Sequence, residues 1–190
     1  MGSRWRTIAR RIRVPMGFAF AALYLWLAQP TALSLLGSLL LVVPGLWLRG
    51  YAAGYVKKNA ELTTSGPYAY TRNPLYLGSL LLGVGFAAAS RNVVIVIGLT
   101  LFLILIYLPV IRGEEEYLRA HFPGFDAYAA RVPRLIPRRV PGVGRGSTPL
   151  PGSGLPGFAP SLYRKHREYN ALVGACAVYG ALALRLYFRR

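Results

Sequence analysis

The stretch VVIVIGLTLFLILIYLPVI, residues 93–111, contains no charged side chain. An α-helix rises about 1.5 Å per residue, so about 20 apolar residues are needed to cross the hydrocarbon core of a bilayer. The stretch therefore predicts one membrane-spanning helix. A chain that contains such a helix is interpreted first as a membrane protein.

Four further apolar runs lie on either side of it, at residues 14–28, 32–48, 75–89 and 171–184. Only Gln29-Pro30-Thr31 separates the first two runs, and only Ser90-Arg91-Asn92 separates the third from residues 93–111. Links this short predict tight helical hairpins. The last run extends to 169–188 if Arg185 snorkels to the interface. We therefore predict an all-α integral membrane protein with about five transmembrane helices.

Basic residues are concentrated on one side of this five-helix topology. The chain has 23 Lys and Arg against 6 Asp and Glu, and 19 of the 23 precede the first helix or fall in the two long loops. The positive-inside rule places these regions, with the N-terminus, in the cytoplasm. Topology and anionic lipid explain the net charge of +17, so we expect membrane lipids as partners and no nucleic acid. The abundance of Arg, Ala, Gly and Pro suggests a GC-rich bacterial genome, and hence the bacterial inner membrane.

The remaining polar residues do not predict a metal or nucleotide site. His121, His166 and Cys176 match no usual zinc-ligand spacing. Residues 142–146, GVGRG, resemble a nucleotide-binding glycine loop only superficially, because they follow an Arg- and Pro-rich stretch instead of a strand. We interpret residues 141–160 as a Pro- and Gly-rich cytoplasmic loop.

The polar motif SGPYAYTRNPLYLG, residues 65–78, precedes and opens the third apolar run. Asn73 followed by Pro74 is typical of an N-cap and a first helical residue, so the third helix should begin there. The free N–H groups of a helix start attract anions, and Arg72 beside them can grip a carboxylate or a phosphate. The alternative is that Arg72 only anchors the helix at the interface, and spacing alone does not separate the two.

Three of the six acidic residues form one run, Glu114–Glu116. Adjacent carboxylates repel one another unless a cation is near. We therefore expect Arg112, Arg119 or a cationic ligand beside them.

The chain beyond the fourth apolar run is expected to change direction. We expect Pro109 to bend or end the fourth helix. A new helix then starts near Gly113 and carries Glu115 inward, because negative charge is favoured at a helix start. Aromatic, aliphatic and basic residues alternate from there to Val132, with a break at Pro123-Gly124. This pattern predicts a cytoplasmic interfacial helical segment, which could serve as a lid.

Taken in order, these motifs resemble the isoprenylcysteine carboxyl methyltransferase family and its phospholipid methyltransferase relatives. The resemblance covers residues 62–137, which we interpret as a methyltransferase-like core after an N-terminal helical hairpin, residues 14–48, in a single membrane domain. The matching elements are Gly66-Pro67-Tyr68, Arg72-Asn73-Pro74-Leu75-Tyr76-Leu77-Gly78, Glu114-Glu115, Leu118, Phe122, Tyr128 and Ile136-Pro137. Their order and spacing together make the match specific.

The resemblance implies a multi-span α-helical enzyme that uses S-adenosylmethionine and no metal. By position, it implies a cofactor pocket formed by Gly66, Tyr68, Arg72, Asn73, Tyr76, Gly78, Glu114 and Glu115. Within this set, we assign the catalytic roles to Arg72 and Glu115. The charges agree with this interpretation, because a sulfonium and an ammonium suit Glu and a carboxylate suits Arg at a helix start.

The methyl acceptor is expected to come from the membrane, as a small lipophilic molecule or a lipid. An ionised carboxylate, as in isoprenylcysteine O-methylation, needs no catalytic base, whereas a lipid amine must lose a proton, for which Glu115 is the first candidate. Three alternatives stay open. They are phospholipid N-methylation, an NADPH-dependent reductase of the sterol-reductase kind with Arg138 and Arg139 at the 2′-phosphate, and a non-catalytic lipid-binding scaffold.

Overall fold

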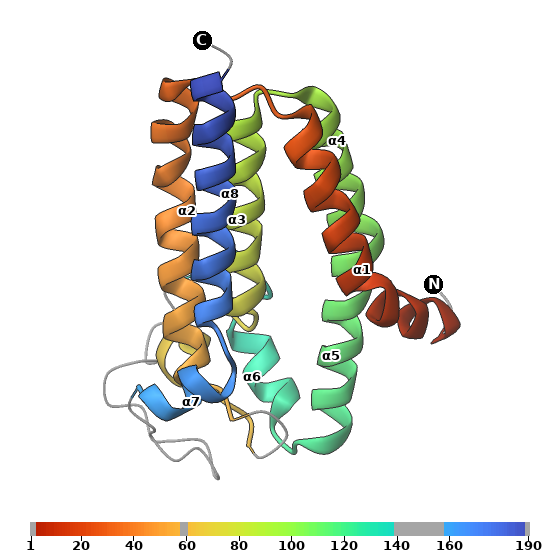
Figure 1. Cartoon of the computed structure of the whole chain (residues 1–190). Coiled ribbons are helices and arrows are strands. Elements are labelled where there is room, and N and C mark those ends of the chain that lie inside the picture. The colour runs from red at the N-terminus through yellow and green to blue at the C-terminus, as the bar shows by residue number, and fades with distance from the viewer. Residues whose placement is uncertain (1–2, 58–60, 139–157, 189–190) are drawn as a thin grey trace. The chain divides into compact units, whose positions relative to one another are not determined.

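The computed structural model of the chain describes residues 3–57, 61–138 and 158–188 (Figure 1). Every regular element in these ranges is a helix, which confirms the predicted all-α fold. The elements are α1 (Ser3–Leu27), α2 (Ala32–Ala53), the 3₁₀ turn η1 (Gly66–Ala69), α3 (Pro74–Ser90), α4 (Val93–Phe102), the π turn η2 (Leu103–Tyr107), α5 (Leu108–His121), α6 (Phe125–Arg131), α7 (Pro160–Lys165) and α8 (Tyr169–Phe188). The expected loop at 141–160 lies mostly outside the described ranges.

Within the described ranges, three helices are long and apolar enough to cross a membrane, namely Ala32–Ala53, Val93–His121 and Tyr169–Phe188. The other two expected spans form shorter apolar helices, Pro15–Leu27 and Pro74–Ser90. The protein is therefore an all-α integral membrane protein, in which three of the five predicted spans meet the required length unaided.

The chain divides into two compact units. The first comprises residues 1–44, 81–114 and 172–190, and the second comprises residues 45–80 and 115–171. The first unit is built from the apolar helices. The second contains most of the polar motif residues, including Arg72, Asn73 and Glu115.

In the first unit the two predicted hairpins are confirmed, and their turns are hydrogen-bonded to each other. The Gln29 N–H donates to the Ser90 carbonyl over 2.8 Å, and the Asn92 side chain donates to the Leu27 carbonyl over 3.0 Å. Asn92 also caps α4, because its side-chain oxygen accepts from the Val94 N–H at 2.9 Å. Helix ends leave backbone groups unpaired, which is costly in an apolar medium, and these bonds satisfy several of them.

Small residues allow close helix packing within the first unit, where α2, α3 and α8 lie side by side (Figure 1). A Cβ on Gly85 of α3 would lie 2.6 Å from Val42 Cγ2 of α2, so only glycine fits there. Between α2 and α8, the hydroxyl groups of Ser38 and Tyr179 are 2.6 Å apart. This bond satisfies two polar groups inside an otherwise apolar packing.

The expected end of the fourth helix at Pro109 is wrong, while a bend there stays a prediction. The helix runs without interruption from Val93 to His121, through the π turn at Leu103–Tyr107. The Leu108 N–H donates to the carbonyl five residues back, so this turn takes one extra residue just before Pro109. Proline has no N–H to donate, and a local π turn is one way in which a helix accommodates it. Consequently no new helix starts near Gly113.

In the second unit the predicted helical segment after His121 is confirmed. The break lies at Pro123-Gly124, where Gly124 has a φ of +94° that favours glycine. Phe125 and Tyr128 of α6 form a buried cluster with Val132, against which Leu62, Leu118 and Ala129 pack. This cluster anchors α6, while the suggested lid function stays a prediction.

We expect Gly85→Leu to lower the thermal unfolding midpoint of the detergent-solubilised protein, because overpacking costs about 1–3 kcal/mol. A Cβ at this position would also lie 3.2 Å from the Ser38 carbonyl oxygen, a backbone atom that cannot turn aside. Gly174→Leu on α8 is the matched control, since a Cβ there meets nothing within 4 Å. Equal midpoints for the two variants would contradict the packing role of Gly85.

Candidate functional site

Two loop segments of the second unit run alongside each other and carry the site. One precedes α3, at residues 70–73, and the other follows α6, at residues 132–138. Their hydrogen bonds run from Arg72 N to Pro133 O (2.9 Å), from Arg138 N to Tyr70 O (3.2 Å), from Thr71 Oγ1 to Arg134 O (3.2 Å) and from Asn73 Nδ2 to Arg134 O (3.1 Å). Four bonds between two short loops fix the backbone from which Arg72 and Arg134 project.

The start of α3 lies directly after the first of these segments. The helix begins at Pro74 as predicted, and the Asn73 carbonyl accepts the Leu77 N–H at 2.9 Å, which makes Asn73 the N-cap residue. The Asn73 side-chain amide donates to Glu115 as well as to the neighbouring loop. Asn73 therefore connects the helix start to the acidic run of α5.

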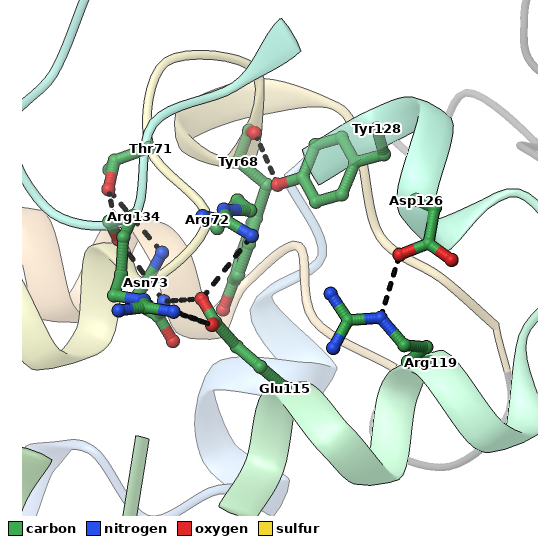
Figure 2. Close-up of polar contacts among 9 residues, drawn as sticks. All are labelled: Tyr68, Thr71, Arg72, Asn73, Glu115, Arg119, Asp126, Tyr128 and Arg134. Carbon is green, nitrogen blue, oxygen red and sulfur yellow. Dashed lines mark hydrogen bonds and ion pairs between the residues drawn. The ribbon is translucent and has the colours of Figure 1, made fainter. Parts of the chain in front are cut away.

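Glu115 lies at the centre of the site (Figure 2). Its side chain is only 7% exposed. Arg134 donates from Nε and Nη2 to Glu115 Oε2, at 2.9 and 2.7 Å. The other oxygen, Oε1, accepts from Asn73 Nδ2 at 3.3 Å and lies 3.5 Å from Arg72 Nη1. One buried carboxylate is thus shared by two guanidinium groups, and the hydrogen bond to Glu115 raises the pKa of Arg134.

The acidic run was expected to have Arg112, Arg119 or a cationic ligand beside it, and Arg119 does lie close enough for the charges of Glu115 and Glu116 to contribute to its raised pKa. The ion pair of Arg119, however, is with Asp126 at 2.7 Å (Figure 2), and both of these side chains are more than half exposed. The expected support from a helix start is absent too, because Glu115 lies in the second half of α5. The charge of Glu115 is compensated by Arg72 and Arg134.

Arg134 is the residue of this charged site that the sequence interpretation missed. It follows Pro133 in an irregular stretch, so no helical or strand period assigns it a face. The signal that was available is the pair of prolines, Pro133 and Pro137, which hold the flanking backbone extended and indicate a loop of fixed course.

Arg72 has one donor without a hydrogen-bond partner in the described structure. Its side chain is 14% exposed, and its Nε is buried without a hydrogen-bond partner. Its closest described charged partner is Glu115, at the long distance of 3.5 Å. A buried guanidinium with an open N–H is suited to an anionic group such as a carboxylate or phosphate.

Tyr128 of α6 is hydrogen-bonded to the chain just before the first of these loops. Its hydroxyl donates to the Tyr68 carbonyl over 2.7 Å (Figure 2). Burial raises the pKa of the Tyr128 phenol, which therefore stays protonated and keeps donating. Tyr68, which the family resemblance assigns to the cofactor pocket, is buried beside it.

Other predicted pocket residues have different surroundings. Gly66 has a φ of +58°, and a Cβ there would meet the Tyr55 ring at 2.6 Å. A Cβ on Gly78 would meet the Arg49 side chain at 2.6 Å. Packing alone therefore accounts for the absence of a side chain at both glycines. Tyr76 and Glu114 are half-buried.

A second charged cluster in the same unit was not foreseen. Arg49 of α2 donates to Glu168 Oε2, from Nε at 3.1 Å and from Nη2 at 2.8 Å, and it also hydrogen-bonds to the Ser79 hydroxyl of α3. Glu168 lies just before α8, where negative charge is favoured. The cluster therefore joins the second-unit parts of α2 and α3 to the start of the last helix.

Metal ligands do not gather within residues 3–57, 61–138 and 158–188, since no three His, Cys, Asp or Glu side chains there form a group. His166 Nε2 is hydrogen-bonded with the Val56 carbonyl, and Cys176 is a free, exposed thiol on α8. Of the two basic residues considered for a 2′-phosphate, Arg138 is exposed and Arg139 lies outside those ranges.

The apolar helices and the charged site define the class of protein, an integral membrane protein with a polar site at one helix start. Residues 32–124 match the family model described as phospholipid methyltransferase. Through this region, just under half of its length, the chain is similar to the phospholipid methyltransferase family, in agreement with the resemblance seen in the motifs. Arg134 lies beyond the matched region.

Two relatives are proteins of metal resistance. The chain is 41% identical over 106 residues to the cobalt-zinc-cadmium resistance protein CzcN of Cupriavidus metallidurans, covering 56% of this chain and 48% of the relative. It is 38% identical over 104 residues to the nickel-cobalt-cadmium resistance protein NccN of Alcaligenes xylosoxydans xylosoxydans, covering 55% and 48%. The chain thus matches about half the length of these relatives. No solved structure matches the chain.

We expect Glu168→Gln to lower the thermal unfolding midpoint of the protein in detergent, because it leaves Arg49 largely buried without a counter-charge. The loss should be about 1–3 kcal/mol, below that of a fully buried pair since both side chains keep some exposure. Glu61→Gln is the matched control, since Glu61 forms a more exposed pair with Lys57 at 3.2 Å and should change the midpoint little. A control that loses as much as Glu168→Gln would contradict this role.

Proposed function

We propose that this chain is an S-adenosylmethionine-dependent methyltransferase of the membrane. It transfers methyl to a small lipophilic acceptor, a carboxylate as in isoprenylcysteine O-methylation. The proposal builds on the family match over residues 32–124 and on the open donor of Arg72. When bound, the cofactor supplies a methyl group on a sulfonium.

The charged groups of the site fit the polar end of this cofactor. Arg72 has an unmet Nε–H beside the start of α3, so these two features together would hold the cofactor carboxylate. Glu115 is the buried anion that would face its cationic groups. Asn73, hydrogen-bonded to Glu115, would keep that carboxylate oriented.

The protein's role in the transfer is alignment and exclusion of water. Methyl transfer to an ionised carboxylate forms an O–CH₃ bond as the S–CH₃ bond breaks, and it releases no proton. No base is then required, and most of the acceleration comes from positioning in a dry site. The buried Glu115 and Tyr128 are consistent with such a site.

Phospholipid N-methylation is the second candidate, and the description of the matching family favours it. In that reaction the acceptor is a lipid amine, which must lose a proton to a base or to water. Both candidates take their acceptor from the bilayer. We place the N-terminus and the site on the cytoplasmic side on the distribution of Lys and Arg. The abundance of Arg, Ala, Gly and Pro supports the bacterial inner membrane as the location.

We expect Arg72→Ala to weaken the binding of S-adenosylhomocysteine in detergent by about tenfold or more. Charge-assisted hydrogen bonds contribute about 1.5–3 kcal/mol, which corresponds to such a factor. Isothermal titration of the purified protein measures the change. Arg119→Ala is the control that should keep the affinity of the unaltered chain, because Arg119 pairs only with the exposed Asp126 among the described ion pairs. Equal affinities for Arg72→Ala and the unaltered chain would refute the site.

The acceptor is identified by incubating membranes that contain the protein with methyl-labelled cofactor. We expect lipid-soluble label that is released by mild base, as an ester is. The matched control is a membrane carrying Arg72→Ala, which should show little label. Base-stable label on amine lipids would instead support phospholipid N-methylation.

A further inference from the structure

Arg134 is hydrogen-bonded to the Glu115 carboxylate, which is the group that would face the cationic part of the proposed cofactor. Both of its contacts with Glu115 Oε2 are short, at 2.9 and 2.7 Å, so this oxygen is taken in the structure. Arg72 lies near the other oxygen. A cationic ligand group therefore cannot reach a free Glu115 unless one guanidinium leaves.

The two guanidinium groups differ in how easily they can leave. The side chain of Arg134 is 44% exposed, whereas that of Arg72 is 14% exposed. Removing Arg72 from Glu115 would leave a cation inside the protein, but Arg134 can turn into water, where a guanidinium is well solvated. Arg134 is the one that can exchange.

The backbone of Arg134 is held independently of its side chain. Its carbonyl accepts from the Thr71 hydroxyl at 3.2 Å and from the Asn73 side chain at 3.1 Å. The Pro133 carbonyl, one residue earlier, accepts from the Arg72 N–H at 2.9 Å. The Arg134 side chain can therefore swing out while the loop, and with it the position of Arg72, stays in place.

An exchange of Arg134 for a cationic ligand group would keep the charge of Glu115 compensated. Two guanidinium groups face the one buried carboxylate, so the charge of Arg134 opposes the approach of a cationic ligand to Glu115. Without Arg134, however, Glu115 would keep only the longer contacts with Arg72 and Asn73, at 3.5 and 3.3 Å. If Arg134 leaves only when a cationic group of the ligand arrives, the charge of Glu115 is compensated both with and without the ligand.

We propose that Arg134 is an exchangeable counter-ion, which holds Glu115 in the ligand-free protein and yields Oε2 to a cationic group of the methyl donor. This inference rests on the proposed function. Arg134 acts through Glu115 and is therefore a positioning residue. The methyl donor then competes with the Arg134 side chain for Glu115. Arg134 therefore lowers donor affinity while its ion pair stabilises the Glu115 carboxylate.

The test compares Arg134→Gln and Arg134→Lys for the binding of S-adenosylmethionine in detergent. Loss of the competing charge in Arg134→Gln should tighten donor binding roughly threefold to fivefold, the size expected for removing a half-exposed ion pair. Arg134→Lys keeps the charge and should stay close to the unaltered chain. Thermal unfolding confirms that each variant is folded.

A neutral probe separates exchange from a general change of the pocket. 5′-Methylthioadenosine shares the adenosine and sulfur of the donor but has neither the ammonium nor the sulfonium, so Arg134→Gln should not tighten its binding. Weaker donor binding in Arg134→Gln, equal shifts for both ligands, or equal behaviour of the two variants would overturn the exchange. If the unaltered chain binds no donor at all, the proposed function itself fails.

Discussion

A carboxylate buried inside a protein needs a counter-charge, and the compensation of Glu115 organises the second unit. Removing such a group from water is costly unless cations and hydrogen-bond donors replace the solvent. The replacements come from two segments far apart in the sequence, Arg72 and Asn73 before α3 and Arg134 after α6. The same contacts that satisfy the charge therefore join the two loops to α5.

Arg72 and Arg134 compensate the charge of Glu115 unequally, and this difference bears on the ligand that the site could bind. Arg134 makes short contacts from a partly exposed position, while Arg72 is more deeply buried and has one donor unmet. The inner cation, Arg72, has one N–H without a partner, and the outer cation, Arg134, can turn away, so the site is suited to a ligand that carries both signs of charge. The proposed methyl donor is such a ligand.

The parts of the fold that could be predicted from the sequence are those set by local signals. Hydropathy and the short polar links determine both hairpins, and Asn73-Pro74 determines the start of α3. Arg72 and Glu115 could be selected because charge is rare beside apolar runs, and Asn73 because it precedes Pro74 at a helix start. What they do for a ligand remains a proposal.

Some features were predicted wrongly or missed because their physical causes leave no local pattern in the sequence. Pro109 does not end its helix, because a π turn absorbs the missing donor. Arg134 lies in irregular chain without a period. Arg49 and Glu168 are 119 residues apart, so only the folded chain reveals their pairing.

The hydrogen bonds between the two loops have a consequence for how such a chain can evolve. On the side of residues 132–138, all four use main-chain atoms, namely the Pro133 and Arg134 carbonyls and the Arg138 N–H. Replacing a side chain there does not delete a backbone carbonyl, and only proline at position 138 would remove the N–H. Side chains of residues 132–138 can therefore change during evolution while the backbone conformation is kept. The insertion or deletion of a single residue, by contrast, would move the main-chain atoms out of register with their hydrogen-bond partners in residues 70–73.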